Sequence, residues 1–482
     1  MRADRGAMAL VLHSHMPYVE GFGTWPFGEE WLWEAVAGVY LPLLELIDGA
    51  PVTLGLTPVL CDQLEAMRGE PGERFVRFMH DVRAPTHAED ALGLERGGEH
   101  ELAAEVRRAA GDYEWAARRF EDRSRHLLGA LAALGRVELW TSAATHPVLP
   151  LLATDAGRRL QLATGIASHE RRFGSFGGGL WLPECAYEPG LERDLHDHGV
   201  TAFCVDQTAA HGYGAAEQLE PVATPAGPVA IPVDWQTVEL VWCERSGYPA
   251  HGVYRNYHGR TVHDLKPWNN AGEPYRHDDA LALARDHARD FVERAVARLD
   301  RHASERGRPG LLACPLDTEL LGHWWYEGIA WLQAVLGEAG RQGLELITLS
   351  EGVERVDAVE RDLAPSSWGR GKDLSTWDSP LVAGLAFEAR SAELRLVSAA
   401  PAAAAGRPAL ERAARELLAL QSSDWAFQVT RELASDYPLR RVREHAAGVD
   451  AALAALTDSA PVPEPKLRAL APDLHLASLV TP

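Results

Sequence analysis

Short runs of apolar residues recur through the first 350 residues of the chain, and helical or loop segments separate them. The runs of strand length cover residues 7–12, 52–56, 137–140, 179–182, 201–205, 229–233, 311–316 and 344–349. Continuous apolar runs that alternate with helical stretches are typical of a parallel sheet covered by helices. The pattern therefore predicts a βα barrel, with an open doubly wound sheet as the alternative.

Polar residues stand at or soon after the ends of these runs. They are His13, His15, Thr57, His146, Glu184, Asp206, Asp234, Asp317, Ser350 and Glu351. Barrel enzymes collect their functional side chains at the carboxyl ends of the strands. A dinucleotide-binding sheet would need a glycine-rich phosphate loop after its first strand, and none follows here. We therefore prefer the barrel.

Three parts of the chain depart from this alternation. Residues 61–135 are charged with helical spacing, which indicates a helical excursion from the barrel. The region from about 186 to 230 ends in a stretch rich in proline, glycine and alanine, and predicts a small inserted subdomain beside the cleft. Beyond about residue 360 helices dominate. We thus expect a catalytic domain over 1–360 and a helical domain over 361–482.

The link between these two domains contains the segment SSWGRGKDLSTW at 366–377. Its glycines indicate a flexible stretch, and a tryptophan on such a stretch is seldom part of a core. We expect this tryptophan loop of the C-terminal domain to face the active cleft.

The composition narrows the partners and the compartment. The formal net charge of −22 disfavours binding to nucleic acid or an anionic membrane and favours a neutral or cationic ligand. Five cysteines form no CxxC pair, as expected of a reducing compartment. With no signal peptide and no 18-residue apolar span, the expected location is the cytoplasm.

Two segments place a single carboxylate among aromatic residues directly after an apolar run. They are WLPECAY at 181–187, with Glu184, and CPLDTELLGHWWYEG at 314–328, with Asp317. Cleavage of a glycosidic bond needs one carboxylic acid to protonate the leaving oxygen and one carboxylate on the opposite side of the sugar. A separation of about 5 to 5.5 Å would indicate retention of configuration, and about 6.5 to 9.5 Å inversion.

Fifteen tryptophans are present, and many lie near these strand ends. Flat aromatic faces suit the apolar C–H faces of glucose rings. Those expected in the core are Trp33, Trp140, Trp242 and Trp331. Those expected in loops, as platforms for a sugar, are Trp25, Trp268, Trp368 and Trp377.

The segment VLHSHMP at 11–17 offers a different chemistry, because His-x-His at the end of a first barrel strand also begins the divalent metal site of amidohydrolases. That interpretation needs further strand-end histidines and a bridging lysine. Only His146 is well placed, and none of the three lysines lies at a strand end. Without a metal, His13, His15 and His146 would hydrogen-bond sugar hydroxyls.

Taken in order, several motifs resemble glycoside hydrolase family 57. The motifs are HSHMP at 13–17, ATHP at 144–147, WLPECAY at 181–187, the segment 314–328 and TLSE at 348–351. Others resemble its 1,4-α-glucan branching enzymes: GTWPFGEEWLWEA at 23–35, SGYP at 246–249, SSWGRGKDLSTW at 366–377 and QSSDWAF at 421–427. The chain departs from the family in a short stretch between the two carboxylates and in Leu321, where phenylalanine is frequent.

The resemblance implies an α/β fold: an incomplete (β/α)7 TIM-like barrel with a small inserted subdomain and a C-terminal all-helical domain. It implies a retaining mechanism without metal or cofactor, with Glu184 as the nucleophile and Asp317 as the acid/base. The partner would be an α-glucan polysaccharide, and the chain a monomer or small homo-oligomer. The substrate-binding residues would be His13, His15, Trp25, His146, Tyr248, Trp268, His323, Trp368, Trp377 and Asp424.

Tyr248 lies in a loop that similar enzymes use to shield the intermediate from water, which favours transfer over hydrolysis. The alternatives are an α-amylase or a 4-α-glucanotransferase with the same carboxylates, or a glucan-binding protein without turnover.

Overall fold

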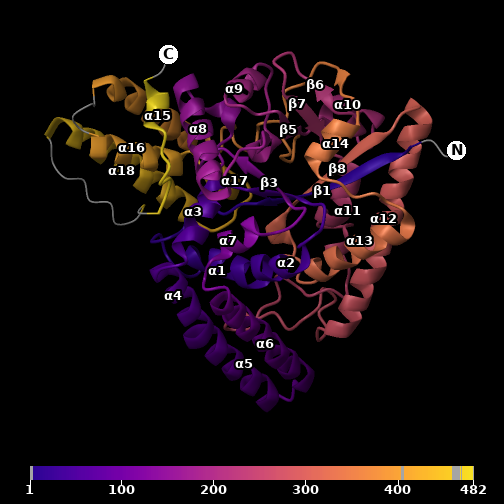
Figure 1. Cartoon of the computed structure of the whole chain (residues 1–482). Helices are drawn as coiled ribbons and strands as arrows, with labels where there is room; N and C mark the ends of the chain where they lie inside the picture. The colour runs from indigo at the N-terminus through magenta and orange to yellow at the C-terminus, as the bar shows by residue number, and fades with distance from the viewer. Residues whose placement is uncertain (1–3, 403–406, 459–466, 468, 481–482) are drawn as a thin grey trace.

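The computed structural model describes residues 4–402, 407–458, 467 and 469–480. Its centre is one sheet in the order β8-β1-β2-β3-β4-β5-β7-β6-β9 (Figure 1). The strands of the parallel part are β1 (Gly6–Ser14), β2 (Thr53–Leu56), β3 (Glu138–Ser142), β4 (Gly179–Trp181), β5 (Ala202–Val205), β7 (Val229–Pro232) and β8 (Gly310–Asp317). Each of these strands coincides with one of the predicted apolar runs. Four of them are buried along their whole length: β1, β2, β4 and β5.

The sheet curls until the segment after β7 approaches β8. β7 is the last parallel strand and β8 the first, and a single parallel bridge joins Val233, just after β7, to Ala313 in β8. The amide of Asp234 donates to the Ala313 carbonyl over 2.9 Å. The seven parallel strands therefore form an incomplete barrel, as predicted, rather than an open doubly wound sheet.

The eighth apolar run, at 344–349, does not form a strand of its own. It contributes one parallel bridge, between Met8 and Leu346. β1 already pairs with β8 along 6–13 and with β2 from Val11 onward, so only its first half has a free edge. Thr348 then caps α14 (Leu349–Arg355) through a capping box with Glu351, which ends the extended segment.

The region 186–230 is not a separate subdomain, contrary to expectation. It contains β5, which pairs with β4 on one side and β7 on the other. The remaining elements are α9 (Leu191–Asp197), α10 (Thr208–His211), the 3-10 turn η5 (Ala216–Leu219) and β6 (Val222–Ala223), which pairs with β7 and with β9 (Val359–Glu360). A longer irregular segment lies further on, at 243–276, between α11 (Trp235–Trp242) and α12 (His277–Arg306).

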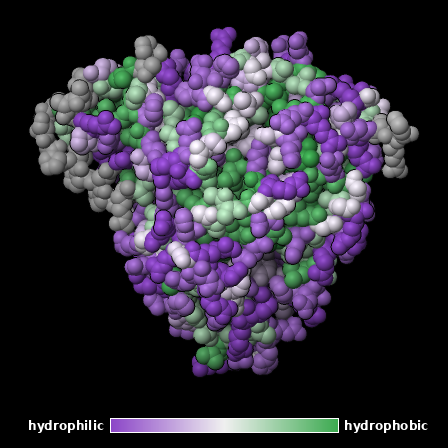
Figure 2. All heavy atoms as spheres, in the orientation of Figure 1, coloured by the Kyte–Doolittle hydropathy of each residue, from purple (hydrophilic) through white to green (hydrophobic). Residues whose placement is uncertain are grey.

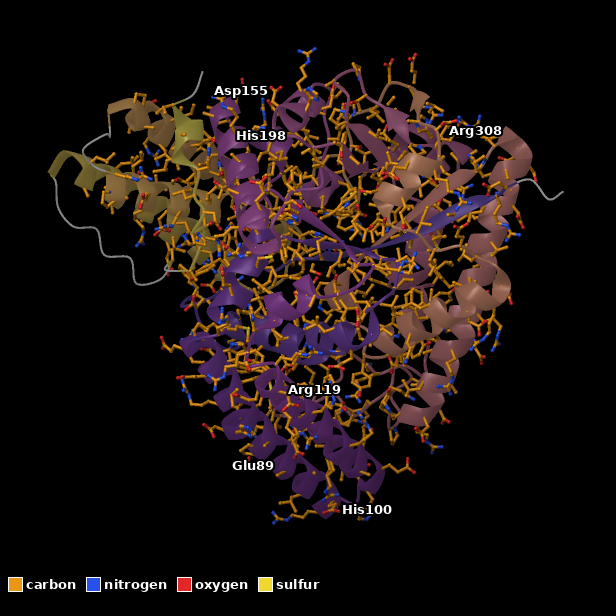
Figure 3. The ribbon with its side chains drawn as sticks, in the orientation of Figure 1. Glu89, His100, Arg119, Asp155, His198 and Arg308 are labelled. Atoms are coloured by element: carbon orange, nitrogen blue, oxygen red, sulfur yellow. The ribbon has the colours of Figure 1, made fainter. Side chains whose placement is uncertain are left out.

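Helices connect the strands and cover the barrel. Those before β3 are α1 (Glu29–Ala35), α2 (Leu41–Leu46), α3 (Pro58–Ala66), α4 (Glu70–Arg77), α5 (Ala84–Arg96), α6 (His100–Asp122) and α7 (Leu127–Ala132), with π-helical turns at Val36–Tyr40 and Phe78–Arg83. α5 and α6 form a hairpin that projects at the bottom of Figure 1, and in Figure 3 His100 lies at its end and Glu89 on its side. α8 (Asp155–Phe173) and α13 (Gly328–Gln342) pack elsewhere on the barrel.

The C-terminal helices are α15 (Ala383–Ala399), α16 (Arg407–Leu420), α17 (Asp424–Thr430) and α18 (Tyr437–Asp458). Their apolar faces share one buried cluster with barrel residues such as Tyr18 and Phe22. Buried Arg441 of α18 donates to the Tyr18 carbonyl over 2.7 Å and stacks on the Phe22 ring. These helices are thus fixed against the strand-end side of the barrel, where β1 stops.

Hydrophilic residues cover most of the face in Figure 2, with apolar patches across its middle. Within the described part of the chain, no helix is long and apolar enough to cross a membrane.

Candidate active site

Glu184 is presented by a strained turn directly after β4. Pro183–Cys185 forms a single 3-10 turn in which Glu184 has φ 62° and ψ 18°. These angles lie in the left-handed region, which residues other than glycine seldom adopt. The Glu184 carbonyl accepts a hydrogen bond from the Trp368 amide over 2.9 Å, which holds the turn. Strain of this kind gathers at functional sites because the surrounding structure must enforce it.

Each carboxylate oxygen of Glu184 accepts one hydrogen bond. Ser423 Oγ donates to Oε1 over 2.7 Å, and the Trp368 indole Nε1 donates to Oε2 over 2.9 Å. Burial raises the pKa of Glu184, while these two donors oppose the rise because they stabilise the ionised form. The site therefore supports a carboxylate that is positioned on both oxygens.

Asp317 has a different environment. It ends β8 and lies beside His13 in the β1–β8 register. No hydrogen bond to its carboxylate is present among the described residues. Burial, followed by the negative charges of Glu319, Glu184 and Asp424, raises the pKa of Asp317 well above its ordinary value. The pKa of Asp317 is thus raised more strongly than that of Glu184, and such a difference separates acid from nucleophile in carboxylate pairs.

A chain of hydrogen bonds from two histidines leads to Glu184. His13 Nε2 and His146 Nε2 are 3.1 Å apart, and His146 Nδ1 is 3.0 Å from Ser423 Oγ. Burial lowers the pKa of both histidines well below its ordinary value, so both are neutral. Since the Ser423 hydroxyl donates to Glu184, it must accept from His146 Nδ1–H. His146 Nε2 is then the acceptor and His13 Nε2–H the donor, which assigns both tautomers.

His15, the third histidine of the site, is hydrogen-bonded to Thr57 and Asp424. Its Nδ1 lies 3.1 Å from Thr57 Oγ1 and its Nε2 2.9 Å from Asp424 Oδ2. Burial lowers the pKa of His15, but the carboxylates of Asp424, Glu319 and Glu184 together outweigh this effect and the net pKa is raised. Burial likewise opposes ionisation of Asp424, yet His15 leaves its pKa lowered. The two residues form an ion pair between the barrel and α17.

Glu319 is a third carboxylate of the site, two residues after Asp317. It accepts hydrogen bonds from the Tyr40 hydroxyl and from the His15 amide. Burial raises the pKa of Glu319 to about 7. The sequence alone does not identify Glu319, although it lies in the same DTE segment as Asp317. A second carboxylate so close in sequence is easily interpreted as a solvent-exposed side chain.

The tryptophan loop is fastened to the barrel at two places. Ser366 and Tyr187 exchange backbone hydrogen bonds of 2.9 Å. Lys372 Nζ lies 2.9 Å from Asp206 Oδ2 and 3.0 Å from the centroid of the Trp235 ring. Asp206 is fully buried at the end of β5. These contacts bring Trp368 against Glu184.

Some expected sugar platforms lie elsewhere. Trp377 is buried, at 4% exposure, and packs with Val148 and Ala186, so it cannot serve as an open platform. Trp268 is half-buried in the irregular segment, where its carbonyl accepts from the Asn256 amide over 2.9 Å. Among the described residues, no hydrogen bond joins either side chain to Glu184 or Asp317.

The core predictions for Trp33, Trp140 and Trp331 are confirmed by their burial. The same prediction is wrong for Trp242, which ends α11 and is 40% exposed.

Trp25 and His323 line a cavity of about 360 Å³ instead of joining the carboxylate cluster. The cavity lies between α1, the α5–α6 hairpin and residues 255–267. Tyr248 is turned toward α12: its hydroxyl donates to Asp290 over 2.7 Å and its ring stacks on His287 at 4.5 Å. Its expected role in shielding the cleft therefore requires the loop to take another position.

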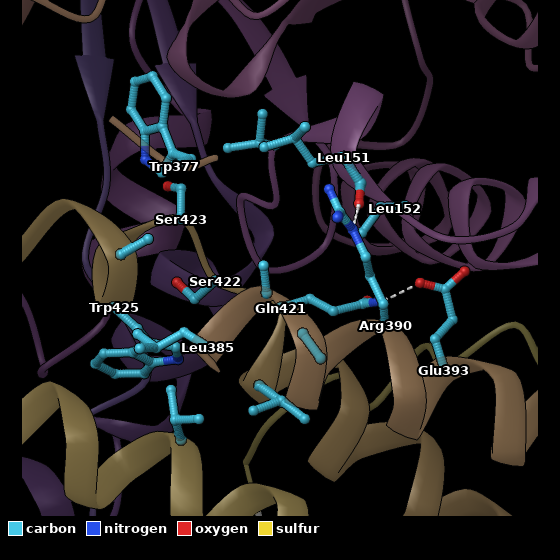
Figure 4. Close-up of a pocket in the computed structure, with 16 residues that line it drawn as sticks. Leu151, Leu152, Trp377, Leu385, Arg390, Glu393, Gln421, Ser422, Ser423 and Trp425 are labelled. Carbon is cyan, nitrogen blue, oxygen red and sulfur yellow. Dashed lines mark hydrogen bonds between the residues drawn. The ribbon is translucent and has the colours of Figure 1, made fainter. Parts of the chain in front are cut away.

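A smaller cavity of about 80 Å³ marks the junction between the barrel and the C-terminal helices (Figure 4). Arg390 Nε donates to the Leu151 carbonyl over 3.0 Å, and Gln421 Nε2 donates to buried Glu393 over 2.9 Å. Ser423 lies in the wall of this cavity. The junction thus fixes the segment that supplies Ser423 and Asp424.

Across the residues that the structure describes, no group of three or more His, Cys, Asp or Glu side chains is arranged to hold a metal ion. Both nitrogens of His15 and both of His146 have hydrogen-bonding partners in the site. The histidines therefore act as hydrogen-bonding groups in this arrangement.

Comparison with known proteins gives consistent matches. Residues 9–363 match the family model described as glycosyl hydrolase family 57, and residues 387–474 match that of the C-terminal region of 1,4-alpha-glucan branching enzyme. The chain is 33% identical to a 1,4-alpha-glucan branching enzyme of Thermococcus kodakarensis, over 92% of this chain and 72% of the relative. It is 34% identical to a probable 1,4-alpha-glucan branching enzyme of Mycobacterium tuberculosis, over 92% and 90% of the two chains.

Among solved structures, the GH57-type branching enzyme from Pyrococcus horikoshii superposes with a TM-score of 0.91 at 30% identity. The match covers 99% of this chain and 97% of that one.

Proposed function

The chain belongs to glycosyl hydrolase family 57, and on that premise we propose that it is a 1,4-α-glucan branching enzyme. It cleaves an α-1,4 bond of a glucan and transfers the released segment to a 6-hydroxyl, forming an α-1,6 branch. The partner is an α-glucan polysaccharide, and the mechanism retains the configuration at the anomeric carbon.

One observation carries the mechanistic part: the contrast between Glu184 and Asp317. Glu184 accepts a hydrogen bond on each oxygen, whereas Asp317 accepts none among the described residues and has a strongly raised pKa. A retaining glycosidase needs this difference between its nucleophile and its acid. The family match and the geometry thus support the same assignment.

In the first step the Glu184 carboxylate attacks C1 of the glucosyl unit. The C1–O4 bond breaks as Asp317 transfers its proton to O4, so that one chain leaves with a free 4-hydroxyl. The other chain remains bound to Glu184 through an ester at C1. Ser423 and Trp368 hold the carboxylate in place for this attack, with donors that face its oxygens.

In the second step the ionised Asp317 removes the proton from the 6-hydroxyl of an acceptor glucan. The resulting oxygen attacks C1, the ester bond breaks, and Glu184 regains its negative charge. His13, His15, His146, Trp368 and Asp424 surround the glucosyl unit and position it. Trp25 and His323, which line the larger cavity, bind the glucan beyond the cleaved bond.

The nearest alternative is an α-amylase or 4-α-glucanotransferase that uses the same two carboxylates. The match of residues 387–474 to the C-terminal region of branching enzymes favours branching. A protein that binds glucan without turnover would not need Glu184 and Asp317 in contrasting environments.

Incubation with amylose separates these functions. Branching forms α-1,6 linkages, measured after debranching, with few new reducing ends. Abundant reducing ends without α-1,6 linkages would identify an amylase. New chain lengths without either product would identify a 4-α-glucanotransferase. Glu184→Ala and Asp317→Ala should abolish the product, and a protein whose effect on amylose survives both substitutions is not using this pair.

We further propose that the chain divides near residue 360 into a catalytic and a helical domain, as the two separately matched segments suggest. We propose a cytoplasmic location as well. It is supported by five cysteines that are all free, of which four are buried. A monomer or a small homo-oligomer is the expected assembly.

A further inference from the structure

Tyr213, Trp242 and Trp324 are exposed aromatic side chains that lie outside the carboxylate cluster. Tyr213 is 56% exposed, Trp242 is 40% exposed and Trp324 is 43% exposed. The rings of Trp242 and Trp324 meet edge to face, with centroids 6.4 Å apart and planes inclined at 74°. Large apolar groups gain free energy from burial, so neighbouring exposed rings are a mark of a binding surface.

The backbone holds Trp324 outward. Residues 321–325 form a tight turn in which the Gly322 amide donates to the Trp325 carbonyl over 2.8 Å. Gly322 has φ 113°, and a Cβ at this position would come within 2.2 Å of the Gly38 carbonyl oxygen, so only glycine fits. Trp325 is buried in the core, while His323 and Trp324 lie at the tip of the turn.

α11 carries Trp242 at its end and lies beside Tyr213. Partial burial, followed by the neighbouring Glu239 carboxylate, raises the pKa of Tyr213, which places this side chain beside Glu239. Glu239 and Trp242 are three positions apart in α11 and therefore share one face of the helix. Tyr213 beside Glu239 and the Trp242–Trp324 pair at the end of α11 are together called here the aromatic row.

The aromatic row reaches the larger cavity at one end. The His323 ring lies 6.0 Å from the Trp324 ring, and its Nε2 lies 3.4 Å from the Tyr257 hydroxyl. His323 and Tyr257 both line the cavity of about 360 Å³. Trp324 also lies on the loop that begins at Asp317, the last residue of β8. The His323 ring and the Tyr257 hydroxyl, which can hydrogen-bond sugar hydroxyls, therefore lie at the end of the aromatic row.

We propose that the aromatic row binds a segment of α-1,4-linked glucan on the surface and leads it into the cleft. The identity of this ligand rests on the proposed function. Two rings inclined to one another offer faces in different directions, which suits a curved glucan chain. Charged side chains accompany the rings, since Glu239 neighbours Tyr213 and Glu244 follows Trp242 along the chain. A protein partner would have to bury these charges, whereas a sugar chain leaves them hydrated.

Binding to amylopectin tests the aromatic row. Native gels with and without the polymer give the dissociation constant of the full chain, and every variant carries Glu184→Gln so that the polymer is not processed. Trp242→Ala with Trp324→Ala should weaken binding about tenfold, because each ring contributes a stacking contact. Trp324→Phe keeps an aromatic face and should retain most of the affinity.

Phe387→Ala is the matched control, because Phe387 is 69% exposed on α15, far from α11 in the chain. It should bind amylopectin as tightly as the parent. Equal binding by the Trp242→Ala, Trp324→Ala double variant and the parent would overturn the proposal. So would a loss in Trp324→Phe as large as in Trp324→Ala, because the aromatic face would then be irrelevant. If the double variant fails to fold, the single Trp324→Ala variant decides.

A separate assay of the chain with its native Glu184 distinguishes this inference from the proposed function. If the chain forms α-1,6 linkages on amylose but its binding to amylopectin does not depend on Trp242 and Trp324, branching is retained and the role of the aromatic row is rejected. Binding that depends on Trp242 and Trp324 without any α-1,6 linkages would retain the row and reject branching.

Discussion

Ser423 Oγ donates a hydrogen bond of 2.7 Å to Glu184 Oε1 and so joins the C-terminal helices to the carboxylate at the end of β4. The Ser423 amide also donates to the His146 carbonyl over 3.0 Å. His146 has φ 58°, so two left-handed residues, His146 and Glu184, converge on one serine. The site is complete only when the helices that follow residue 383 are docked on the barrel.

Ser423→Ala should lower kcat about tenfold or more, because a hydrogen bond to a charged group contributes about 1.5 to 3 kcal/mol. The substitution removes a donor that opposes the rise in the pKa of Glu184. That pKa should rise further, so the acidic limb of the pH profile of kcat/KM should move to higher pH. Ser423→Thr keeps the hydroxyl and should restore both properties. An unchanged acidic limb in Ser423→Ala would argue against Glu184 as the ionised nucleophile.

Trp368→Phe removes the indole donor to Glu184 Oε2 while keeping an aromatic ring, and should likewise lower kcat about tenfold. Trp377→Phe is the matched control. It lies in the same loop, and its buried Nε1 has no hydrogen-bond partner among the described residues. Its kcat should change far less. Steady-state kinetics on amylose measures both, and equal losses would show that packing of the loop matters rather than the hydrogen bond.

Glu319→Gln should shift the basic limb of the pH profile to lower pH. Asp317 must be protonated to act as the acid, so activity falls as the pH rises through its pKa. After burial, the Glu319 charge is the largest factor that raises this pKa. Glutamine removes the charge but still accepts the hydrogen bonds from Tyr40 and the His15 amide. A basic limb at the parent's position would show that another group sets it.

Lys372→Met should lower the free energy of unfolding by about 2 kcal/mol, because it leaves the buried Asp206 carboxylate without its cation. Urea denaturation measures the change. Asp206→Asn in the Lys372→Met background removes the unpaired charge and should recover part of the stability. No recovery would mean that Lys372 acts through its packing on Trp235 instead.

Treatment with EDTA should leave the branching activity intact. The prediction follows from the hydrogen bonds that occupy His15 and His146, whose nitrogens face Thr57, Asp424, His13 and Ser423. Activity is compared before and after dialysis against the chelator, with and without added Zn²⁺. A loss that Zn²⁺ restores would revive the metal interpretation of the His-x-His motif.

The strands were predictable because a parallel strand buried on both faces needs a continuous apolar run, and seven such runs became barrel strands. The run at 344–349 is apolar as well but does not form a strand. Strand pairing depends on a free edge of a neighbouring strand, and local sequence does not encode where such an edge lies. The prediction of a subdomain at 186–230 is wrong for a related reason. Its turn-rich end suggested an insertion, yet β5 lies in the middle of the sheet.

Among the aromatic residues, the sequence predicts environments for Trp242 and Trp377 that are opposite to those observed. Trp242 lies in an apolar helical run, which predicts a core position, but it ends α11 on the surface. Trp377 lies in a polar loop, which predicts an open position, but barrel and helical residues cover it. Burial is decided by what packs against a side chain, and that partner comes from elsewhere in the chain.

The sequence by itself determined the parallel βα framework and marked Glu184 and Asp317 as strand-end carboxylates in aromatic surroundings. Local properties suffice for this, since apolar runs and residue types are visible along the chain. Tertiary structure alone decided which donors face each carboxylate, the tautomers of His13 and His146, and the part played by Ser423. These depend on distances between segments more than 100 residues apart, and such distances exist only once barrel and helices have packed.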